Sequence, residues 1–319
     1  MADSGPIIES QLYEHFRSTI PQRKIVVDSA DQPWVLYDAG PRNVRSPLVC
    51  LSPVCGTADV FYRQLLDLSA EGYRIISVEY PAYWSVEEFC DGFVKLMDHM
   101  QLDKVHIFGA SLGAYLGQKL AERTYRSPRV HSLFLCNGFM DTTAFRQTKL
   151  AKAYWAMPAF WLKRQLMMNL PTDDLEPSVA KSIDFMVEKL DTLDRSQLAS
   201  RLTMNCTDSY VEPQKIQDVF VTIMDVFDES ALSQRCKEEM YKCYPEAKRA
   251  HLKSGGNFPY LACHTEVNLM LKIHLLTFQG TRYCAKDPTL INPDEIRAVR
   301  GELEPPTVQD ERNAENLDQ

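Results

Sequence analysis

Residues 104–118 of the chain read Lys-Val-His-Ile-Phe-Gly-Ala-Ser-Leu-Gly-Ala-Tyr-Leu-Gly-Gln. The apolar run 105–108 predicts a buried strand, and the leucines that follow it recur at helical spacing. The Gly-x-Ser-x-Gly motif at 109–113 therefore falls where a strand turns sharply into a helix, which is the setting of a nucleophilic serine. Glycines suit this turn because the strand and the helix pack closely there. A glycine-rich turn with an incidental serine at Ser111 is the alternative.

The segments around this motif alternate between strand-like and helix-like patterns. Strands are expected at 24–28, 34–38, 47–52, 73–78, 105–108, 130–136, 219–224 and 247–253. Helices are expected at about 61–72, 87–100, 230–244 and 260–278, and directly after Ser111. Strands that alternate with helices predict an α/β fold, here a mostly parallel eight-stranded sheet with helices on both faces.

Three segments depart from this alternation. Residues 139 to about 215 lack strand patterns and are rich in Met and aromatic residues, which predicts a helical lid insertion over the end of the sheet. Most of these side chains are expected to pack internally, but adaptable apolar surfaces also bind apolar ligands or peptide tails. Residues 1–22 predict a peripheral helix or a loose arm. Residues 286–319 predict an acidic, mostly disordered tail with one helical turn near Glu295, which leaves a single domain over residues 1–285.

Composition limits the class of protein. The chain has 319 residues, 45% of them hydrophobic, and a net charge of −8, which is typical of a globular protein and argues against nucleic acid as a partner. Nine cysteines without a Cys-x-x-Cys motif indicate a reducing compartment, and no cofactor or metal site is predicted. The sequence shows no signal peptide, spanning segment or lipid anchor, so we expect a cytosolic protein.

A nucleophilic serine needs an acid and a base from later loops, in the order serine, acid, histidine. Asp225 and Asp228 follow the predicted strand 219–224, and Asp228 matches the acid position better because it lies in the loop beyond the strand. Alternatively, both carboxylates simply cap that turn.

The base is missing from its expected position. The loop before the closing helix reads Gly255-Gly-Asn-Phe-Pro-Tyr260, where α/β-hydrolases commonly have Gly-His-Phe-Pro. Asn257 has no nitrogen that titrates near neutral pH and cannot accept the serine proton. The chain has seven histidines, at 15, 99, 106, 131, 251, 264 and 274. His264 is the nearest in sequence but lies about 10 Å further along a helix, so we expect all seven to be packed or exposed elsewhere; one of them acting as the base stays an alternative.

The oxyanion hole is also altered. One donor would be the backbone N–H of Leu112. The other should come from the loop after strand 47–52, where hydrolases often show His-Gly but this chain has Ser52-Pro53. Proline has no N–H, which leaves Val54 as the candidate donor.

These motifs resemble the α/β-hydrolase-fold family, and more narrowly a member of it that is associated with spastic paraplegia. The resemblance rests on LYDAG at 36–40, GTADV at 56–60, FCDGF at 89–93, LDKVH at 102–106, GASLG at 109–113, SYVEP at 209–213, IMDVFD at 223–228 and GGNFPY at 255–260. It implies a protein without hydrolase activity that is cytosolic and partly associated with endosomal and trans-Golgi membranes. It also implies binding to the hydrophobic end of a T-cell co-receptor's cytoplasmic tail and a role in sorting.

Two functions follow from these observations. The first is a non-catalytic binding module, a pseudoenzyme whose cleft over Ser111 holds an apolar peptide end or acyl chain and whose attachment to membranes depends on a protein partner. The second is a weak serine hydrolase of esters or thioesters that uses Ser111 with an unrecognised base. A histidine nitrogen within hydrogen-bond reach of the Ser111 hydroxyl would favour the second.

Overall fold

The computed structural model describes residues 5–27, 32–145, 152–168, 170, 171, 175–228 and 230–291. Its centre is one sheet with the strand order β1-β2-β4-β3-β5-β6-β7-β8. The strands are β1 (Gln22–Ile25), β2 (Trp34–Ala39), β3 (Leu48–Leu51), β4 (Ile75–Glu79), β5 (Val105–Ala110), β6 (Val130–Cys136), β7 (Phe220–Val226) and β8 (Lys248–Leu252). Only the pairs β1–β2 and β2–β4 are antiparallel, which confirms the predicted mostly parallel eight-stranded sheet.

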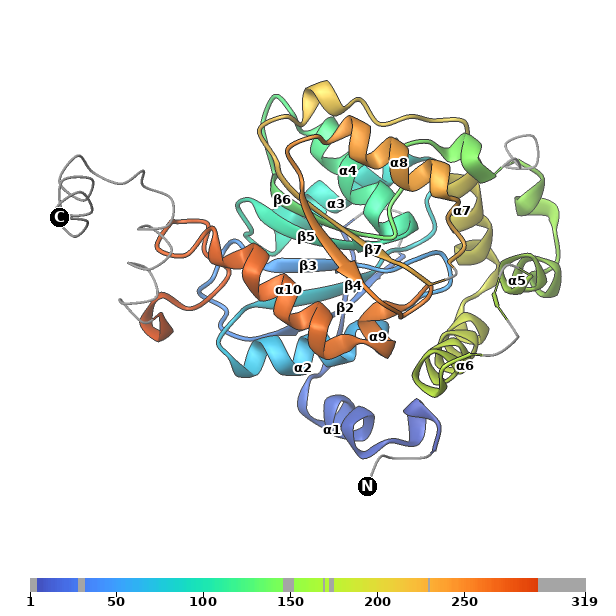
Figure 1. Ribbon diagram of the computed structural model, residues 1–319, viewed down its shortest axis with the longest axis horizontal. Coiled ribbons are helices and arrows are strands. Elements are labelled where there is room, and N and C mark those ends of the chain that lie inside the picture. The colour runs from blue at the N-terminus through green and yellow to red at the C-terminus, as the bar shows by residue number, and fades with distance from the viewer. Residues whose placement is uncertain are drawn as a thin grey trace, which may run out of the picture.

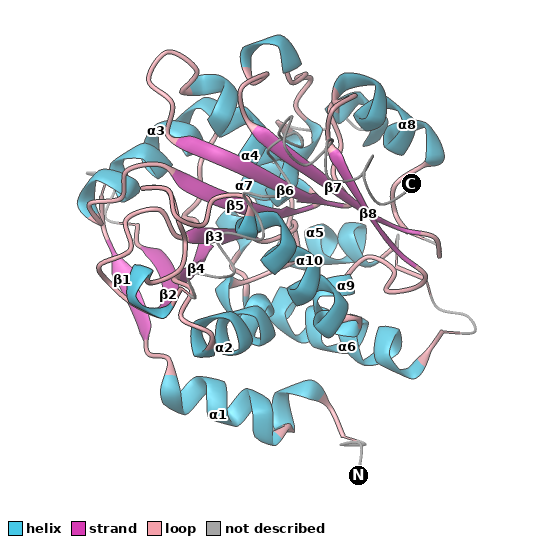
Figure 2. Cartoon of the chain, turned by 60° about the vertical axis from the view of Figure 1, so that its left-hand side comes forward, coloured by secondary structure: helices cyan, strands magenta, loops and turns pink. Residues whose placement is uncertain are grey.

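Helices cover both faces of the sheet, as Figures 1 and 2 show. α3 (Val86–His99), α4 (Leu112–Arg123) and α8 (Gln234–Cys243) cover one face. α1 (Gln11–Thr19), α2 (Tyr62–Ala70), α9 (Pro259–Ala262) and α10 (His264–Leu276) lie on the other. The segment between β6 and β7 adds the insertion helices α5 (Ala159–Met167), α6 (Pro177–Thr192) and α7 (Arg195–Cys206). Short 3-10 turns lie at Ile7–Glu9, Ala58–Phe61, Thr142–Phe145, Ala153–Ala156, Pro213–Lys215 and Pro288–Leu290.

The central strands show why the sheet needs two layers of helices. In β5, Val105 and Ile107 pack into the core on one face, whereas Phe108 and Ala110 pack into the core on the other. All four are buried, because successive side chains of a strand point to opposite faces and both faces are covered. The continuous apolar pattern that predicted these strands is therefore a direct result of this burial.

The N-terminal helix is more than a peripheral arm, because Tyr13 and Phe16 of α1 are buried. The Tyr13 hydroxyl donates to Asp59 Oδ2 at 2.5 Å, and Lys189 Nζ of α6 donates to the Tyr13 hydroxyl at 2.6 Å and to Asp59 Oδ2 at 2.8 Å. Thr57 donates to the other oxygen of the Asp59 carboxylate. This buried network, which we call the Lys189 network, ties α1, the loop after β3 and the insertion together.

The Lys189 network makes stability depend on pH. Burial alone would raise the pKa of Asp59, but Lys189 and the hydrogen bonds around the carboxylate hold it below its usual value. The stabilisation is therefore complete above the unfolded-state pKa of about 4 and is lost as the pH falls through the lower folded-state pKa. We expect the stability difference between the wild type and a variant without the Lys189 charge to shrink below about pH 4 in urea unfolding. A difference that stays constant from neutral pH to about pH 3 would contradict this prediction.

Within these ranges, no helix is both long enough and apolar enough to cross a membrane. The chain continues past α10 to Ile291, and Lys286 forms a β-bridge with Tyr73 while the Asp287 N–H donates to the carbonyl of Gly72. The rest of the predicted tail, including the turn expected near Glu295, lies outside the described residues.

Candidate functional site

Ser111 stands between β5 and α4 with φ 50° and ψ −112°, in a region that L-residues other than glycine seldom adopt. Its N–H donates to the carbonyl of Cys136 at 2.9 Å, so β6 helps to hold the turn. A Cβ on Gly113 would lie 2.0 Å from the carbonyl oxygen of Leu51, and one on Gly109 would lie 2.5 Å from the Cα of Ala114. Both glycines of the motif are thus required by the close approach of α4 to the sheet.

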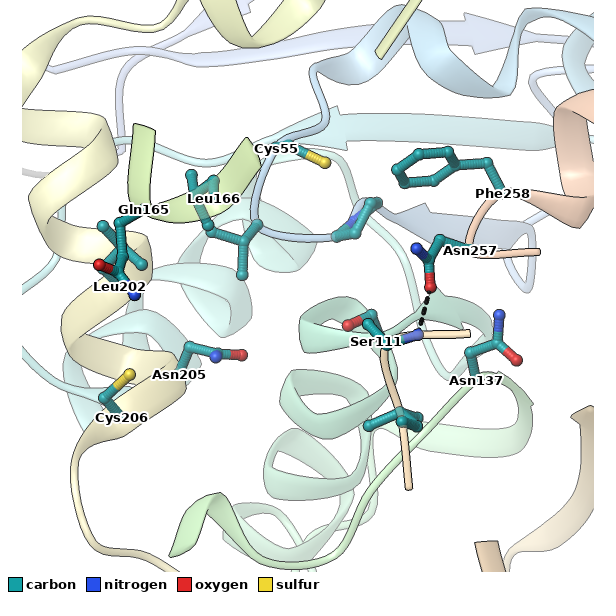
Figure 3. A pocket seen from close by; sticks show the side chains of 14 residues that line it. Cys55, Ser111, Asn137, Gln165, Leu166, Leu202, Asn205, Cys206, Asn257 and Phe258 are labelled. Atoms are coloured by element: carbon teal, nitrogen blue, oxygen red, sulfur yellow. Dashed lines mark hydrogen bonds between the residues drawn. The ribbon is translucent and has the colours of Figure 1, made fainter. Parts of the chain in front are cut away.

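The loop at residues 255–257 occupies the position where the base is expected. Asp228 accepts hydrogen bonds from the N–H groups of Gly255 at 2.8 Å and of Gly256 at 2.9 Å. The side-chain oxygen of Asn257 accepts from the N–H of Ala231 at 2.7 Å, the bond drawn in Figure 3. Asp228 and Asn257 therefore fix two loops to each other, and within the described chain no hydrogen bond joins either of them to the Ser111 hydroxyl.

Asp225, the other candidate acid, binds a tyrosine outside the cavity lining. Its side chain is buried and accepts a hydrogen bond from the hydroxyl of Tyr241 in α8. Burial, together with this hydrogen bond, raises the pKa of Tyr241 above its usual range. Asp225 does not line the cavity over Ser111.

All seven histidines fall within the described ranges, and none of them lines the cavity over Ser111. His106 of β5 and His274 of α10 are both buried, and a ring nitrogen of each lies 2.7 Å from the Ser132 hydroxyl. Burial lowers the pKa of His106 to about 4 and lowers that of His274 well below its usual value, so both imidazoles are neutral.

The other five histidines are exposed or contact residues outside the cavity lining. His15 and His99 are exposed on α1 and α3, His131 packs against Tyr283, His251 stacks on Phe227, and His264 Nδ1 lies 3.8 Å from Asp67. This arrangement removes the geometric support that a replacement base would need.

Ser111 faces a cavity of about 140 Å³. Figure 3 shows the Ser111 side chain on one wall, with side chains of α5 and α7 on the facing wall. The lining residues are Pro53, Val54, Cys55, Ser111, Asn137, Gln165, Leu166, Leu202, Asn205, Cys206, Ala231, Leu232, Asn257 and Phe258. These described lining residues are mostly apolar and include no Asp, Glu, Lys, Arg or His. A cavity of about 150 Å³ in another protein holds one benzene molecule, so this one suits a single small, uncharged group.

Two amides of the lining were not identified from the sequence. The side-chain oxygens of Asn137 and Asn205 are buried and have no hydrogen-bond partner among the described residues. Asn137 is held by its amide nitrogen, which donates to the carbonyl of Gly256 at 3.1 Å. The signal for Asn137 was its position directly after β6, because ligands of parallel sheets bind at the carboxyl ends of the strands. Asn205 lies on α7 and had no such signal.

The loop after β3 is held by a buried cation. Arg201 of α7 is 1% exposed and donates to the carbonyl oxygens of Val54, at 3.2 Å, and of Gly56. Burial raises the pKa of Cys55 in this loop to about 12, so its thiol is protonated and is not a nucleophile. In the described chain no protein group accepts a hydrogen bond from the N–H of Val54 or Leu112.

The insertion leaves apolar side chains exposed beside this cavity. α5 contributes Gln165 and Leu166 to the lining, whereas Phe160 is 64% exposed and Trp161 is 52% exposed. At the end of the helix Met168 is 69% exposed. Only part of the Met- and aromatic-rich stretch therefore packs internally, and these three side chains give it an exposed apolar surface.

Comparisons with known proteins agree with this architecture. A family description of the α/β hydrolase fold matches residues 46–205. The chain is 58% identical to maspardin of Homo sapiens over 300 residues, which cover 94% of this chain and 97% of that protein. It is also 58% identical to maspardin of Danio rerio, over 91% of this chain and 94% of that protein. Solved structures with a similar fold include a carboxylesterase of Nitrososphaera gargenis (TM-score 0.64, 17% identity, 79% of this chain and 97% of that one). A thioesterase domain from the curacin biosynthetic pathway has a TM-score of 0.59 at 14% identity, over 80% of this chain and 99% of that one.

Proposed function

Because the chain belongs to the maspardin family of α/β-hydrolase-fold proteins, we propose that it is a non-catalytic binding protein whose cavity over Ser111 receives an apolar group of a protein partner. The observation that carries this proposal is Asn257, which stands in the cavity lining where a hydrolase has its base. By resemblance, the partner is the hydrophobic end of a receptor's cytoplasmic tail, and the role is in sorting at endosomal and trans-Golgi membranes.

The lack of a base among the described lining residues supports a non-catalytic role. In subtilisin, loss of the catalytic histidine lowers kcat by about 2 × 10⁶. Among the described residues that line the cavity there is no histidine or carboxylate, so none of them is suited to accept the proton of Ser111. An uncharged, mostly apolar lining of this kind supports binding rather than proton transfer.

The chemistry of the cavity also indicates which part of a peptide would enter. A terminal carboxylate would lose its hydration without gaining a cationic partner, because no Lys or Arg is among the described residues of the lining. An apolar side chain carries no such penalty, and the free oxygens of Asn137 and Asn205 can accept from backbone N–H groups beside it. The exposed apolar side chains of α5 would then contact the neighbouring residues of the peptide.

Narrowing the mouth of the cavity tests this proposal. Ala231 lines the cavity and is exposed, so Ala231→Phe should block entry without disturbing the core. We expect at least about tenfold weaker binding of a fluorescent peptide that carries the apolar end of the receptor tail, measured by anisotropy. Gln234→Phe, which adds the same ring at an exposed position outside the lining, should leave the affinity unchanged. Equal effects of both variants, or no binding by the wild type, would contradict the proposal.

A second function, a weak ester or thioester hydrolase, is favoured by one observation. Ser111 keeps a positive φ of 50°, a conformation that costs energy and that persists where the surroundings enforce it. The close packing of Gly109 and Gly113 against the sheet is sufficient to enforce it, so the strain does not by itself require catalysis.

A further inference from the structure

A second cavity lies at the amino-terminal ends of the parallel strands, whereas Ser111 lies at their carboxyl ends. Ser111 follows the carboxyl end of β5, whereas Arg45 and Arg74 precede the neighbouring parallel strands β3 and β4. This cavity of about 410 Å³, which we call the arginine cleft, is lined by Arg23, Arg42, Asn43, Arg45, Arg74, His99, Met100 and Gln101. Its volume is in the range of small-molecule sites, and none of the described residues that line it is acidic.

One arginine of the cleft has a complete set of partners. Arg74 is 5% exposed and directs its Nε, at 3.1 Å, and its Nη2, at 3.0 Å, to the two oxygens of the Asp38 carboxylate. Its Nη1 donates to the carbonyl of Val44 at 2.7 Å. The Arg74–Asp38 pair therefore fixes β2 and the following loop, and its charge is balanced.

Two other guanidinium groups of the cleft contact the Asp38 carboxylate, which Arg74 already binds. Arg42 contacts Asp38 Oδ2, and Arg23 Nη1 lies 3.6 Å from the same oxygen. Both side chains are about half exposed, at 45% for Arg23 and 50% for Arg42. Three guanidinium groups, those of Arg23, Arg42 and Arg74, therefore share the single carboxylate of Asp38. The fourth, that of Arg45, has no ion pair or side-chain hydrogen bond with any described residue.

The arginine cleft therefore carries more positive than negative charge, although the net charge of the whole chain is −8. Burial, and then the nearby charges of Arg23 and Arg74, lower the pKa of Arg42, as expected where like charges are crowded. Two further acidic residues lie beside the lining. Asp287 lies beside Asn43, and its carboxylate already accepts from the N–H and hydroxyl of Thr289. The N–H of Asp103 donates to the carbonyl of Arg45 at 3.1 Å. An anion in the cleft would relieve this crowding.

We infer that the arginine cleft binds the clustered phosphate groups of a small molecule, either a soluble inositol polyphosphate or the headgroup of a phosphoinositide. Planar guanidinium groups bind phosphate oxygens two at a time, and several converging forks select for several phosphates. Among the described residues that line the cleft none is Phe, Tyr or Trp, so phosphate contacts are favoured over stacking of a nucleobase. His99 at the rim adds a further donor.

Titration calorimetry of the full chain with inositol hexakisphosphate tests the inference. The double variant Arg23→Gln/Arg45→Gln removes two charges but leaves the Arg74–Asp38 pair intact. We expect at least tenfold weaker binding than in the wild type. The control Arg126→Gln/Arg235→Gln removes two exposed arginines outside the cleft, so the net charge changes equally. We expect less than twofold weakening in this control, and the thermal midpoints of both variants report whether either is misfolded.

Absence of saturable binding by the wild type would overturn the inference. An equal loss of affinity in the control variant would also overturn it, because binding would then reflect net charge and not a specific site. Vesicles with and without phosphatidylinositol bisphosphate identify the source of the phosphates. Binding to the phosphoinositide vesicles that Arg23→Gln/Arg45→Gln abolishes assigns the cleft to a lipid headgroup. Binding of the soluble polyphosphate alone assigns it to a free metabolite.

Discussion

Replacing Lys189 by methionine is expected to lower the free energy of unfolding by about 3–5 kcal/mol, because a buried charge then loses its partner. Methionine keeps most of the length and apolar volume of the side chain, so the change mainly removes the charge. Asp59, which is 7% exposed, would keep the hydrogen bonds from Tyr13 and Thr57 but lose the cation at 2.8 Å. The Tyr13 hydroxyl would lose a contact at the same time. Urea unfolding followed by circular dichroism measures the effect.

A matched control lies on a neighbouring helix. Lys163 of α5 pairs with Asp191 at 3.0 Å, but the Asp191 side chain is 68% exposed. Lys163→Met should therefore cost no more than about 1 kcal/mol. Adding Asp59→Asn to Lys189→Met should recover part of the loss, because it removes the unpaired charge. Equal destabilisation by Lys189→Met and Lys163→Met would show that the buried ion pair contributes nothing beyond a surface pair.

Replacing Asn257 by histidine is expected to speed covalent labelling of Ser111 by a fluorophosphonate probe by about a hundredfold, the lower end of what a positioned general base contributes. Asn257 shares the cavity lining with Ser111, and Asp228 already holds the two preceding residues of the loop. The new imidazole must be neutral to accept the serine proton, so labelling should rise as the pH increases through about 6.5. Labelling is measured as the initial rate of fluorescence incorporation at several pH values.

The controls separate a restored base from a change in access. Asn257→Gln has no titratable nitrogen and should label as slowly as the wild type, and Ser111→Ala in the Asn257→His background should not label at all. Rapid labelling of the wild type at Ser111 would contradict the non-catalytic proposal and favour the hydrolase alternative. Failure of Asn257→His to label faster would show that the serine is not aligned for attack.

Much of the fold followed from short-range pattern. The strand β6 was expected at 130–136 and lies at Val130–Cys136, because an apolar run bounded by polar residues fixes a buried strand locally. The predicted closing helix at 260–278 is divided into α9 and α10 at Cys263, which hydrophobic spacing alone did not indicate. Boundaries of this kind depend on how a helix meets its neighbours rather than on its own pattern.

The parts that sequence reasoning missed depend on contacts between distant positions. Lys189 binds Asp59 and Tyr13 across 130 and 176 positions of the chain, so no local pattern could pair them. The same holds for the arginine cleft, in which Arg23 and Arg74 meet at Asp38 only after β1, β2 and β4 have assembled. Asn257, in contrast, was found from the sequence because the residues around it keep a hydrolase-like order.

The Lys189 network also governs how the molecule opens. Because one lysine joins α1 to α6, these two helices should exchange their amide protons with solvent as one sub-global unit rather than separately. A tag or a truncation that destabilises α1 should therefore also destabilise the insertion, which forms one wall of the Ser111 cavity. We therefore expect α1 and the insertion beside the Ser111 cavity to have the same free energy of local unfolding.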